Sequence, residues 1–544
     1  MREFSADLGD ILKTGLRNRE VDDRQALKFL ELCNLEPTDS GLVPFNSVVP
    51  AFDLTALTAS GVEIEHPFPQ VFIGSQYGFI CTTDSIYTFS LNNFKTISRL
   101  TIYDHDNPTV ETDLNTGIPW NLIDMGKSWI LLNGVDLVYY FNTEGMIGVE
   151  DKVYVRKNYG VGCGTYYKGR IVLGGLKPDT FWSGTWQNFW NTWITKKKDT
   201  GLDFNKMING INTLMPVEKN WLWWSTIGGG DVSMLIKGEG MVSGNLTSDY
   251  DSSNPLYRAI LKRNEQGFAC LDKPGSILCI KALGEYIIVY GDYSIKAYKH
   301  KDIGLGSTLA PINIPLLDTV GLLNSGAADG DLYHHVFLDS SGTLWELTSD
   351  LMAKVLGYKE YFFDMLRTGP KVTYTQLPFN VDTFGAFYIT DGFVTYKLVK
   401  NGLLKVTQSI SSATYMQGNS IGICEDFDRE EIGYFTTDIL DLNRTGIKTI
   451  NSIDVICNED TVVKSGTIKV CIYYRYTQGE AYKVTDWYLC NNEGSVNFPV
   501  QAVDFKIKIK VSDYRRFSIG RLIIHFQYND RRFKRSLDVN QAFS

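Results

Sequence analysis

Between Pro67 and Glu425 the chain repeats one pattern: an apolar run, a short turn with Gly, Asp or Asn, and a second run rich in aromatic residues. Two such runs joined by a tight turn predict an antiparallel hairpin. The seven predicted hairpins are FICTTDSIYTF from Phe79, ILLNGVDLVYYF from Ile130, RIVLGGLKPDTFW from Arg170, WLWWSTIGGGDVSML from Trp221, YIIVYGDYSIKAY from Tyr286, HVFLDSSGTLWEL from His335 and AFYITDGFVTYKL from Ala386. They recur about every 35 to 65 residues, where a four-stranded blade needs roughly 40 to 50. We therefore predict an all-β fold with a β-propeller of about six to eight blades.

The stretches between these hairpins carry no long amphipathic helical pattern. A parallel sheet is therefore excluded, because its crossover connections need such helices. Stacked β-sandwiches remain the alternative, since hairpins at regular intervals suit both architectures.

Both ends of the chain depart from the repeated pattern. Apolar residues at helical spacing from Arg19 to Asn34 predict a short N-terminal helix. The stretch from Glu36 to Glu65, rich in Pro, Ser and Thr, predicts an extended arm that reaches a neighbour. After the acidic run EDFDREE, longer strands with fewer glycines predict a β-sandwich. The predicted domains are 1–66 (N-terminal helix and extended arm), 67–424 (β-propeller) and 425–544 (C-terminal β-sandwich).

Composition narrows the function classes. The 544 residues are 44% hydrophobic and 13% aromatic, which favours strands. A net charge of −9 gives no global field for capturing nucleic acid. The N-terminus is acidic and lacks an apolar core, so no signal peptide is expected. No apolar run reaches the roughly 20 residues of a membrane helix.

The nine cysteines are scattered and form no CxxC pair. We expect reduced thiols that fill β cores. Adjacent His334 and His335 should point to opposite faces of one strand, so that one packs and the other meets solvent. Without paired ligands at short spacing, neither a metal site nor a cofactor is predicted.

Two short motifs resemble catalytic turns but lack their context. Gly418-Asn419-Ser420-Ile421-Gly422 matches G-x-S-x-G, which works only on a strand-to-helix turn with an acid and a His after it. The one downstream His, His525, lies on a predicted sandwich strand. The run from Asp339 to Trp345 is similar to an Asp-box turn without its full spacing. We interpret both as structural turns and predict no enzyme activity.

A cationic strand is the first candidate contact surface. Three lysines alternate with apolar residues, so one face of that strand is charged, and three arginines follow within a hairpin's reach. The six residues are Lys506, Lys508, Lys510, Arg515, Arg516 and Arg521. They predict a basic face that meets DNA or an acidic protein ring, with a solvated face as the alternative.

A tryptophan cluster is the second candidate. Trp186, Trp190 and Trp193 recur near helical spacing. They either pack in a core or form an aromatic contact cluster that stacks sugars or a partner.

The segment from Ala282 to Leu347 carries a family resemblance. It contains GEYIIVYGDYSI from Gly284, GLLNSGAA from Gly321 and HHVFLDSSGTLWEL from His334. These resemble three successive features of the tail hub or nozzle family of short-tailed bacteriophages. The first motif resembles the family's strand, turn and returning strand, the second resembles the segment of small residues that begins with glycine, and the third resembles the hairpin that follows. That family is also described as packaged-DNA stabilisation proteins.

The resemblance implies a structural subunit of the virion tail, made in the host cytoplasm. It implies a homohexameric ring below portal and adaptor proteins that surrounds the DNA exit channel, seals packaged DNA and touches it transiently on exit. Tail fibre, needle or distal tail proteins would be further partners. A carbohydrate-binding propeller for host attachment is the alternative, which the tryptophan cluster suggests.

Overall fold

The computed structural model describes residues 3–21, 27–52, 70–105, 107–117, 119–140, 152–158, 160–176, 219–224, 267–302, 307–375, 385–416, 419–424, 432–440, 442, 446–458, 463–477, 479–512 and 517–528. Within these ranges the structure is almost entirely β. The one α-helix there is α7 (Lys359–Phe362), and two short 3₁₀ helices are η1 (Ile11–Lys13) and η2 (Asp364–Arg367). The all-β prediction is confirmed.

The chain divides into two compact units. The larger comprises Val49–Thr383 and Ile410–Cys424. The smaller comprises Met1–Val48, Phe384–Ser409 and Glu425–Ser544. One division falls between Cys424 and Glu425, but residues 1–48 and 384–409 group with residues 425–544. The units therefore follow neither the predicted separate domain 1–66 nor an unbroken propeller over 67–424.

Six sheets make up the larger unit in the described ranges. The first contains β6 (Gln70–Ile73), β7 (Tyr77–Cys81), β8 (Ile86–Ser90) and β9 (Asn93–Arg99). The second contains β10 (Ile102–Asp104), β11 (Asn121–Asp124), β12 (Trp129–Leu132), β13 (Leu137–Tyr140) and β14 (Val153–Arg156). The third contains β15 (Val161–Tyr167), β16 (Arg170–Leu176), β17 (Trp221–Trp224) and β18 (Gly267–Cys270).

The fourth sheet contains β19 (Ile277–Leu283), β20 (Tyr286–Gly291), β21 (Ile295–Asp302) and β22 (Ser307–Asn313). The fifth contains β23 (Ala328–Gly330), β24 (His334–Leu338), β25 (Leu344–Thr348) and β26 (Ala353–Gly357). The sixth joins β31 (Ile410–Met416) and β32 (Asn419–Cys424) to β5 (Val49–Phe52), which runs parallel to β32. Strand β27 (Lys371–Thr375) also belongs to this unit.

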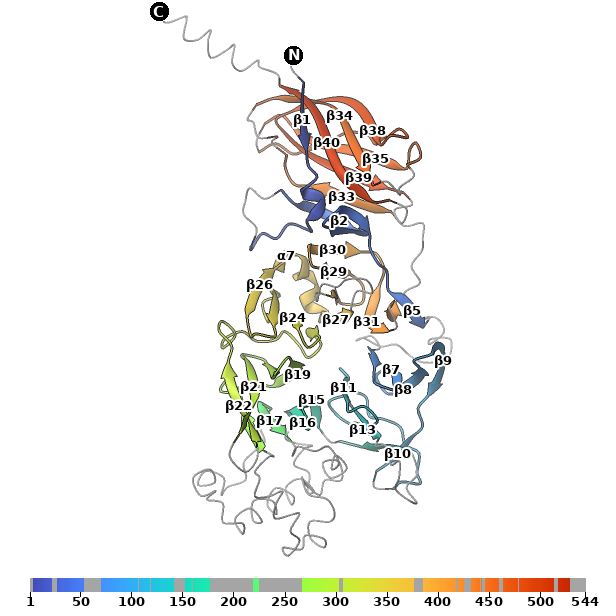
Figure 1. Ribbon diagram of the computed structural model, residues 1–544, viewed down its shortest axis with the longest axis vertical. Helices are drawn as coiled ribbons and strands as arrows, with labels where there is room; N and C mark the ends of the chain where they lie inside the picture. The colour runs from blue at the N-terminus through green and yellow to red at the C-terminus, as the bar shows by residue number, and fades with distance from the viewer. Residues whose placement is uncertain are drawn as a thin grey trace, which may run out of the picture. The chain divides into compact units, whose positions relative to one another are not determined.

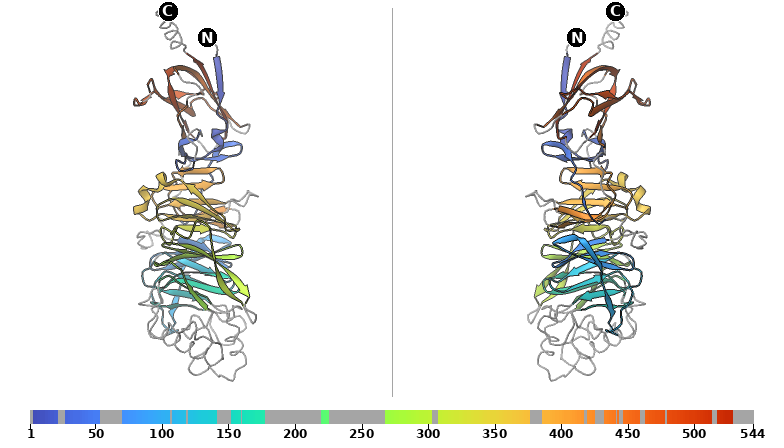
Figure 2. Two further views of the ribbon diagram at one scale, coloured as in Figure 1. Left: turned by 90° about the vertical axis from the view of Figure 1, so that its left-hand side faces the viewer. Right: turned by 90° about the vertical axis from the view of Figure 1, so that its right-hand side faces the viewer.

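These sheets follow one another around a ring. Strand β11 packs on β15 and β15 on β19; further round, β23 contacts β27, β27 contacts β31 and β31 contacts β6 of the first sheet. Phe79 of the first sheet shares an apolar core with Trp129 of the second. Figure 1 shows this ring face-on, and Figure 2 shows it from two sides. The circuit of small antiparallel sheets confirms the predicted propeller, and we call this part the propeller unit.

A polar chain links three neighbouring members of the ring. Lys281 Nζ on β19 lies 2.7 Å from Asp329 Oδ1 on β23. The other oxygen of Asp329 accepts a hydrogen bond from the Tyr374 backbone N–H on β27, at 2.8 Å. The Tyr374 hydroxyl donates to Asp331 at 2.7 Å. Ion pairing and hydrogen bonding offset the desolvation of these groups, so the ring is fixed by directional contacts as well as apolar packing.

Two sheets form the smaller unit. One has the strand order β3 (Leu35–Thr38), β4 (Gly41–Pro44), β40 (Ile519–Tyr528), β34 (Lys448–Cys457) and β38 (Ser495–Ala502), and β1 (Glu3–Asp7) also pairs with β40. The other runs through β28 (Ala386–Thr390), β29 (Thr395–Val399), β30 (Gly402–Val406), β2 (Phe29–Cys33), β33 (Gly433–Thr437), β39 (Asp504–Val511), β35 (Ile468–Arg475) and β36 (Lys483–Val484). Strand β37 (Tyr488–Leu489) also pairs with β35.

Alternating burial explains why these two sheets pack face to face. Strand β38 buries every second residue, and β39 alternates buried apolar residues with half-buried lysines. Strand β38 of the first sheet contacts β35 and β37 of the second. Each sheet thus hides one apolar face, which confirms the predicted C-terminal β-sandwich. We call this part the sandwich unit.

The predicted N-terminal helix is wrong. Residues 22–26 lie outside the described ranges, but Phe29–Cys33 is strand β2, which pairs antiparallel with β33. Phe29, Leu32 and Cys33 are buried there. The apolar spacing suited a helix, yet a strand in the middle of a sheet offers these side chains more burial than an isolated helix could.

The predicted free arm is also wrong where it is described. Strands β3 and β4 form a hairpin on the β40 sheet, and β5 joins the propeller unit. Leu35, Leu42 and Phe45 are buried. The apolar residues of this stretch therefore have a core within the chain; residues 53–69 lie outside the described ranges.

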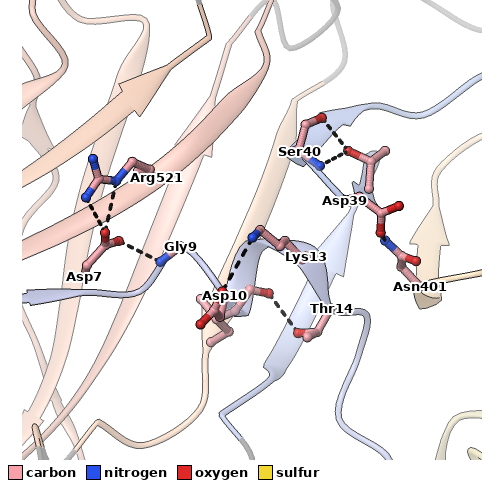
Figure 3. A network of polar contacts seen from close by, with 11 residues as sticks. Asp7, Gly9, Asp10, Lys13, Thr14, Asp39, Ser40, Asn401 and Arg521 are labelled. Atoms are coloured by element: carbon pink, nitrogen blue, oxygen red, sulfur yellow. Dashed lines mark hydrogen bonds and ion pairs between the residues drawn. The ribbon is translucent and has the colours of Figure 1, made fainter.

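Strand β1 lies alongside β40, although more than half a thousand residues separate them in sequence. Figure 3 shows the polar contacts that hold this end. Asp7 accepts hydrogen bonds from the Arg521 guanidinium at 2.5 and 3.0 Å and from the Gly9 N–H at 2.9 Å. The N-terminus is therefore part of the sandwich.

Five of the seven predicted hairpins are confirmed, as β7–β8, β12–β13, β20–β21, β24–β25 and β28–β29. The second halves of the hairpins from Arg170 and Trp221 lie outside the described ranges. All nine cysteines are described, none of them forms a disulfide, and seven are buried, as expected for core thiols. Among the described residues, no helix has the length and apolar character needed to cross a membrane.

Candidate interaction face on strand β39

Lys506, Lys508 and Lys510 project from the same side of β39, because their neighbours Phe505, Ile507, Ile509 and Val511 are buried on the other side. In register they stand beside β33 on one flank and β35 on the other. The predicted alternation is therefore present. We call these three residues the lysine face.

Each lysine of this face lies over an aromatic ring. The Nζ atom of Lys506 is 4.4 Å from the Tyr482 ring centroid, that of Lys508 is 4.9 Å from Tyr434, and that of Lys510 is 4.6 Å from Trp487. Cation–π contacts of this kind are sparse in proteins and contribute about 0.5 to 1 kcal/mol when exposed. Three along one strand make the face a mixed cationic and aromatic surface.

A carboxylate lies among the lysines. Glu31 Oε2 is 2.6 Å from Lys508 Nζ and accepts a 2.5 Å hydrogen bond from the Thr436 hydroxyl. Desolvation pushes the pKa of Glu31 upward, but the hydrogen bonds from Lys508 and Thr436 and the positive charge of Lys508 outweigh it and hold the pKa below its ordinary value. Glu31 is therefore ionised at neutral pH and neutralises the middle lysine.

Lys506 is affected by burial. Desolvation lowers the pKa of its ammonium, against the opposite influence of Asp438 and Glu31. Its ammonium shares the Tyr482 ring with the Arg475 guanidinium, which lies 4.8 Å from that ring and 2.7 Å from Asp504. Cations and anions therefore lie side by side at this end of the lysine face.

The predicted arginines do not extend this face as far as they are described. Arg521 lies on β40, in the other sheet, and forms an ion pair with Asp7. Arg515 and Arg516 lie outside the described residues. Of the six predicted cations, the three lysines of β39 share one strand face and Arg521 does not belong to it.

The contacts of the predicted tryptophan cluster are not described. Trp186, Trp190 and Trp193 all lie outside the described residues. Farther along the chain, Leu222, Trp223 and Trp224 of β17 are buried. These side chains pack in a core of the propeller unit.

The hydrolase-like motif forms no nucleophile elbow where it is described. Ser420 lies inside strand β32, is buried, and its hydroxyl donates to Thr375 Oγ1 at 3.1 Å. His525 lies on β40 and its ring contacts Asp454 at 2.8 Å. The serine is therefore bound within a sheet and not raised on a strained turn before a helix.

The Asp-box-like run is a structural turn. Asp339 Oδ1 accepts hydrogen bonds from the backbone N–H groups of Ser341 and Thr343, at 2.8 and 2.9 Å. Its other oxygen accepts from Trp345 Nε1 at 2.9 Å. One carboxylate thus satisfies the donors of the β24–β25 connection, as such side chains do in tight turns.

Sequence reasoning missed the partners of the lysine face. Glu31 lay in the wrongly predicted helix, and Tyr482 and Trp487 lie between β35 and β37. The alternation around Lys508 was visible, but no local signal places residue 31 beside residue 508.

Among the described residues, no three or more His, Cys, Asp or Glu side chains gather to hold a metal ion.

Comparison with known proteins gives no family. No family model matches the sequence, and no curated protein matches it. Among solved structures, PorZ, a bacterial surface component of the type-IX secretion system of Porphyromonas gingivalis, aligns at a TM-score of 0.32 and 8% identity, over 79% of this chain and 44% of that chain. This chain thus spans less than half of PorZ.

A second solved structure is a complex of Saccharomyces cerevisiae Dbp5 with Nup159, Gle1, IP6 and ADP. It aligns at a TM-score of 0.24 and 8% identity, over 92% of this chain and 93% of that chain. Neither likeness carries an argument about function at such scores.

Proposed function

We propose that this chain is a non-catalytic structural subunit of a short-tailed bacteriophage tail, a ring-forming hub or nozzle protein around the DNA exit channel. The observation that carries the proposal is the resemblance of the segment from Ala282 to Leu347 to that family. The segment runs from the end of β19 into β25 and so spans most of two successive blades, β19–β22 and β23–β26.

The glycine that opens GLLNSGAA has a physical reason to be there. A Cβ atom on Gly321 would lie 1.7 Å from the carbonyl oxygen of Asp292, so no larger residue fits. Leu322 then bridges to Asp339 of the next blade. The resembling residues therefore serve the junction between consecutive blades, which supports reading them as an architectural signature.

The described polar clusters favour a structural role over an enzymatic one. Ser420, His335 and Asp339 are each satisfied by neighbouring protein groups. A catalytic side chain must instead be directed towards the position that its substrate occupies. The carbohydrate-binding alternative depends on tryptophans outside the described residues, so no observed contact favours it.

Native mass measurement tests the proposal. The isolated chain should be monomeric or weakly associated and should form a closed homohexamer when a preassembled portal and adaptor platform is present. A chain that stays monomeric on every such platform, or that binds glycans as a monomer, would contradict the structural role.

A further inference from the structure

The sheet that carries the lysine face ends in an open edge. Strands β36 and β37 both pair with β35, and Thr485 between them continues the ladder through its N–H to the Ile472 carbonyl, at 3.0 Å. Within the described ranges, no strand pairs with the outer side of the stretch Lys483–Leu489. A row of unpaired backbone groups is a template for an incoming strand.

This edge is unusually apolar for a surface. The exposed fractions are 54% for Val484, 38% for Trp487 and 58% for Leu489. The stretch carries two exposed charges, Lys483 and Asp486, of the kind that protect an open edge. The exposed aromatic and aliphatic side chains beside them are instead typical of the centre of a protein interface. The composition indicates a protein partner that buries these side chains.

Cations surround the apolar edge. Lys469 and Lys483 are exposed on β35 and β36, in register with Leu489 and Tyr474. Lys510 stacks on the Trp487 ring. A strand laid along the edge would meet ammonium groups beside apolar ones, so charge complementarity selects a segment in which acidic and apolar residues alternate.

DNA suits the surface less well. Glu31 neutralises Lys508 in the middle of the lysine face, so the face offers a phosphate backbone few uncompensated cations. Nucleic-acid affinity rises with the number of phosphates neutralised, and the exposed apolar residues would gain nothing from a hydrated backbone. The observations favour a polypeptide.

We propose that the edge formed by Lys483–Leu489, flanked by Lys469 and the lysine face, binds an extended acidic segment of a neighbouring protein as an added β-strand. This inference rests on the proposed function, since it names the partner of a structural subunit. Backbone pairing supplies affinity, packing against the exposed Trp487 and Leu489 side chains selects apolar positions, and the lysines select acidic ones.

The test uses the full chain and a short synthetic peptide of alternating Glu and Val, with a Lys and Val peptide and a DNA duplex as comparison probes. The acidic peptide should bind, and amide hydrogen exchange should slow in Lys483–Leu489 but not in β34. Trp487→Ala should weaken binding about tenfold or more, as loss of an interface anchor does.

The double variant Lys469→Gln, Lys483→Gln should weaken peptide binding chiefly at low salt, because exposed charges are screened. Lys405→Gln, an exposed lysine on β30, is the matched control and should bind as the parent does. Thermal unfolding of each variant shows whether it remains folded.

Three outcomes would overturn the inference: no binding of the acidic peptide, binding that Trp487→Ala leaves unchanged, or tight DNA binding that depends on these lysines while the peptide is ignored. Peptide binding is measured on the isolated chain. Ring formation by native mass can therefore fail or succeed independently, which separates this inference from the proposed function.

Discussion

His335 is a buried histidine whose two ring nitrogens are both used. Nδ1 faces the Tyr290 hydroxyl at 2.9 Å and Nε2 faces the Ala282 carbonyl at 3.1 Å. The carbonyl can only accept, so Nε2 carries the proton and Nδ1 accepts from the tyrosine. His334, the next residue, is partly exposed. One histidine of the pair is therefore packed in the core, as predicted, whereas the other is only partly exposed to solvent.

We predict that His335 makes the propeller unit sensitive to acid. Desolvation, with a smaller contribution from Lys281, lowers its pKa to about 4, below the ordinary value of 6.5. The depressed pKa contributes stability above pH 6.5 that is lost as pH falls towards 4, because the unfolded chain takes up the proton first. The loss should be about 2 to 3 kcal/mol.

Chemical denaturation at pH 7 and pH 4.5 measures this loss. His335→Gln should be less stable at pH 7 but should lose less stability between the two pH values than the parent, whereas His334→Gln should behave as the parent. Asp329, Asp331 and Lys281 are charged groups that also act on His335, so the stability loss of each variant is compared with that of the parent. An unchanged loss in His335→Gln would contradict the prediction.

Ser420→Ala should have a small structural effect and no catalytic one. The substitution removes the hydroxyl that donates to Thr375, at a cost of about 1 kcal/mol for a buried hydrogen bond. Urea unfolding measures it, with Ser420→Thr as a test of crowding in β32. A hydrolytic activity present in the parent and lost only in Ser420→Ala would refute the non-enzyme interpretation.

Strand β3 is tied to β29 by a buried ion pair. Lys397 Nζ lies 2.5 Å from Glu36 Oε2 and 3.3 Å from the Asn46 carbonyl, and the lysine side chain is fully buried. Desolvation lowers the Lys397 pKa, but the charge of Glu36 outweighs it and the pKa is raised. Glu36, in a segment predicted as a free arm, thus supplies the negative charge that balances the buried Lys397 ammonium.

Glu36→Gln should therefore destabilise the sandwich unit by about 3 kcal/mol or more, because it leaves a buried ammonium uncompensated. The double variant Glu36→Leu, Lys397→Met should recover most of that loss, since apolar side chains remove both desolvation costs. Guanidinium unfolding of the single and double variants measures the coupling. Additive losses would show that the pair does not act as a unit.

The sequence reveals hairpins between neighbouring strands better than it reveals the pairing of strands that are far apart in the chain. The β20–β21 hairpin could be predicted because its apolar runs and its Gly-Asp turn are contiguous. The pairing of β1 with β40 could not, because nothing in Glu3–Asp7 names its partner. For the same reason the lysines of β39 were predicted, whereas Glu31 and the covering rings were not.

At the scale of the whole molecule, the sandwich unit draws on three separate stretches of the chain. Residues of 1–48 supply β1 to β4, residues of 384–409 supply β28 to β30, and residues after 424 supply the remaining strands. Deleting residues 1–60 would also remove β5 from the propeller unit. The predicted boundary at residue 424 therefore marks a crossing between units and not a point where the chain can be divided.

The fragment 425–544 should accordingly fail to fold alone. It lacks β1 and β4, which pair with β40, and β2, which pairs with β33, so the long strands Ile519–Tyr528 and Gly433–Thr437 would each expose an unpaired edge beside apolar side chains. Open apolar edges favour aggregation over folding. We expect an aggregating fragment without a cooperative unfolding transition, and we expect that joining residues 1–48 to it through a flexible linker restores solubility at least in part. Circular dichroism and size-exclusion chromatography measure both properties. A monomeric 425–544 fragment that unfolds cooperatively would show instead that the C-terminal strands form a complete sandwich, with the N-terminal strands as an addition to it.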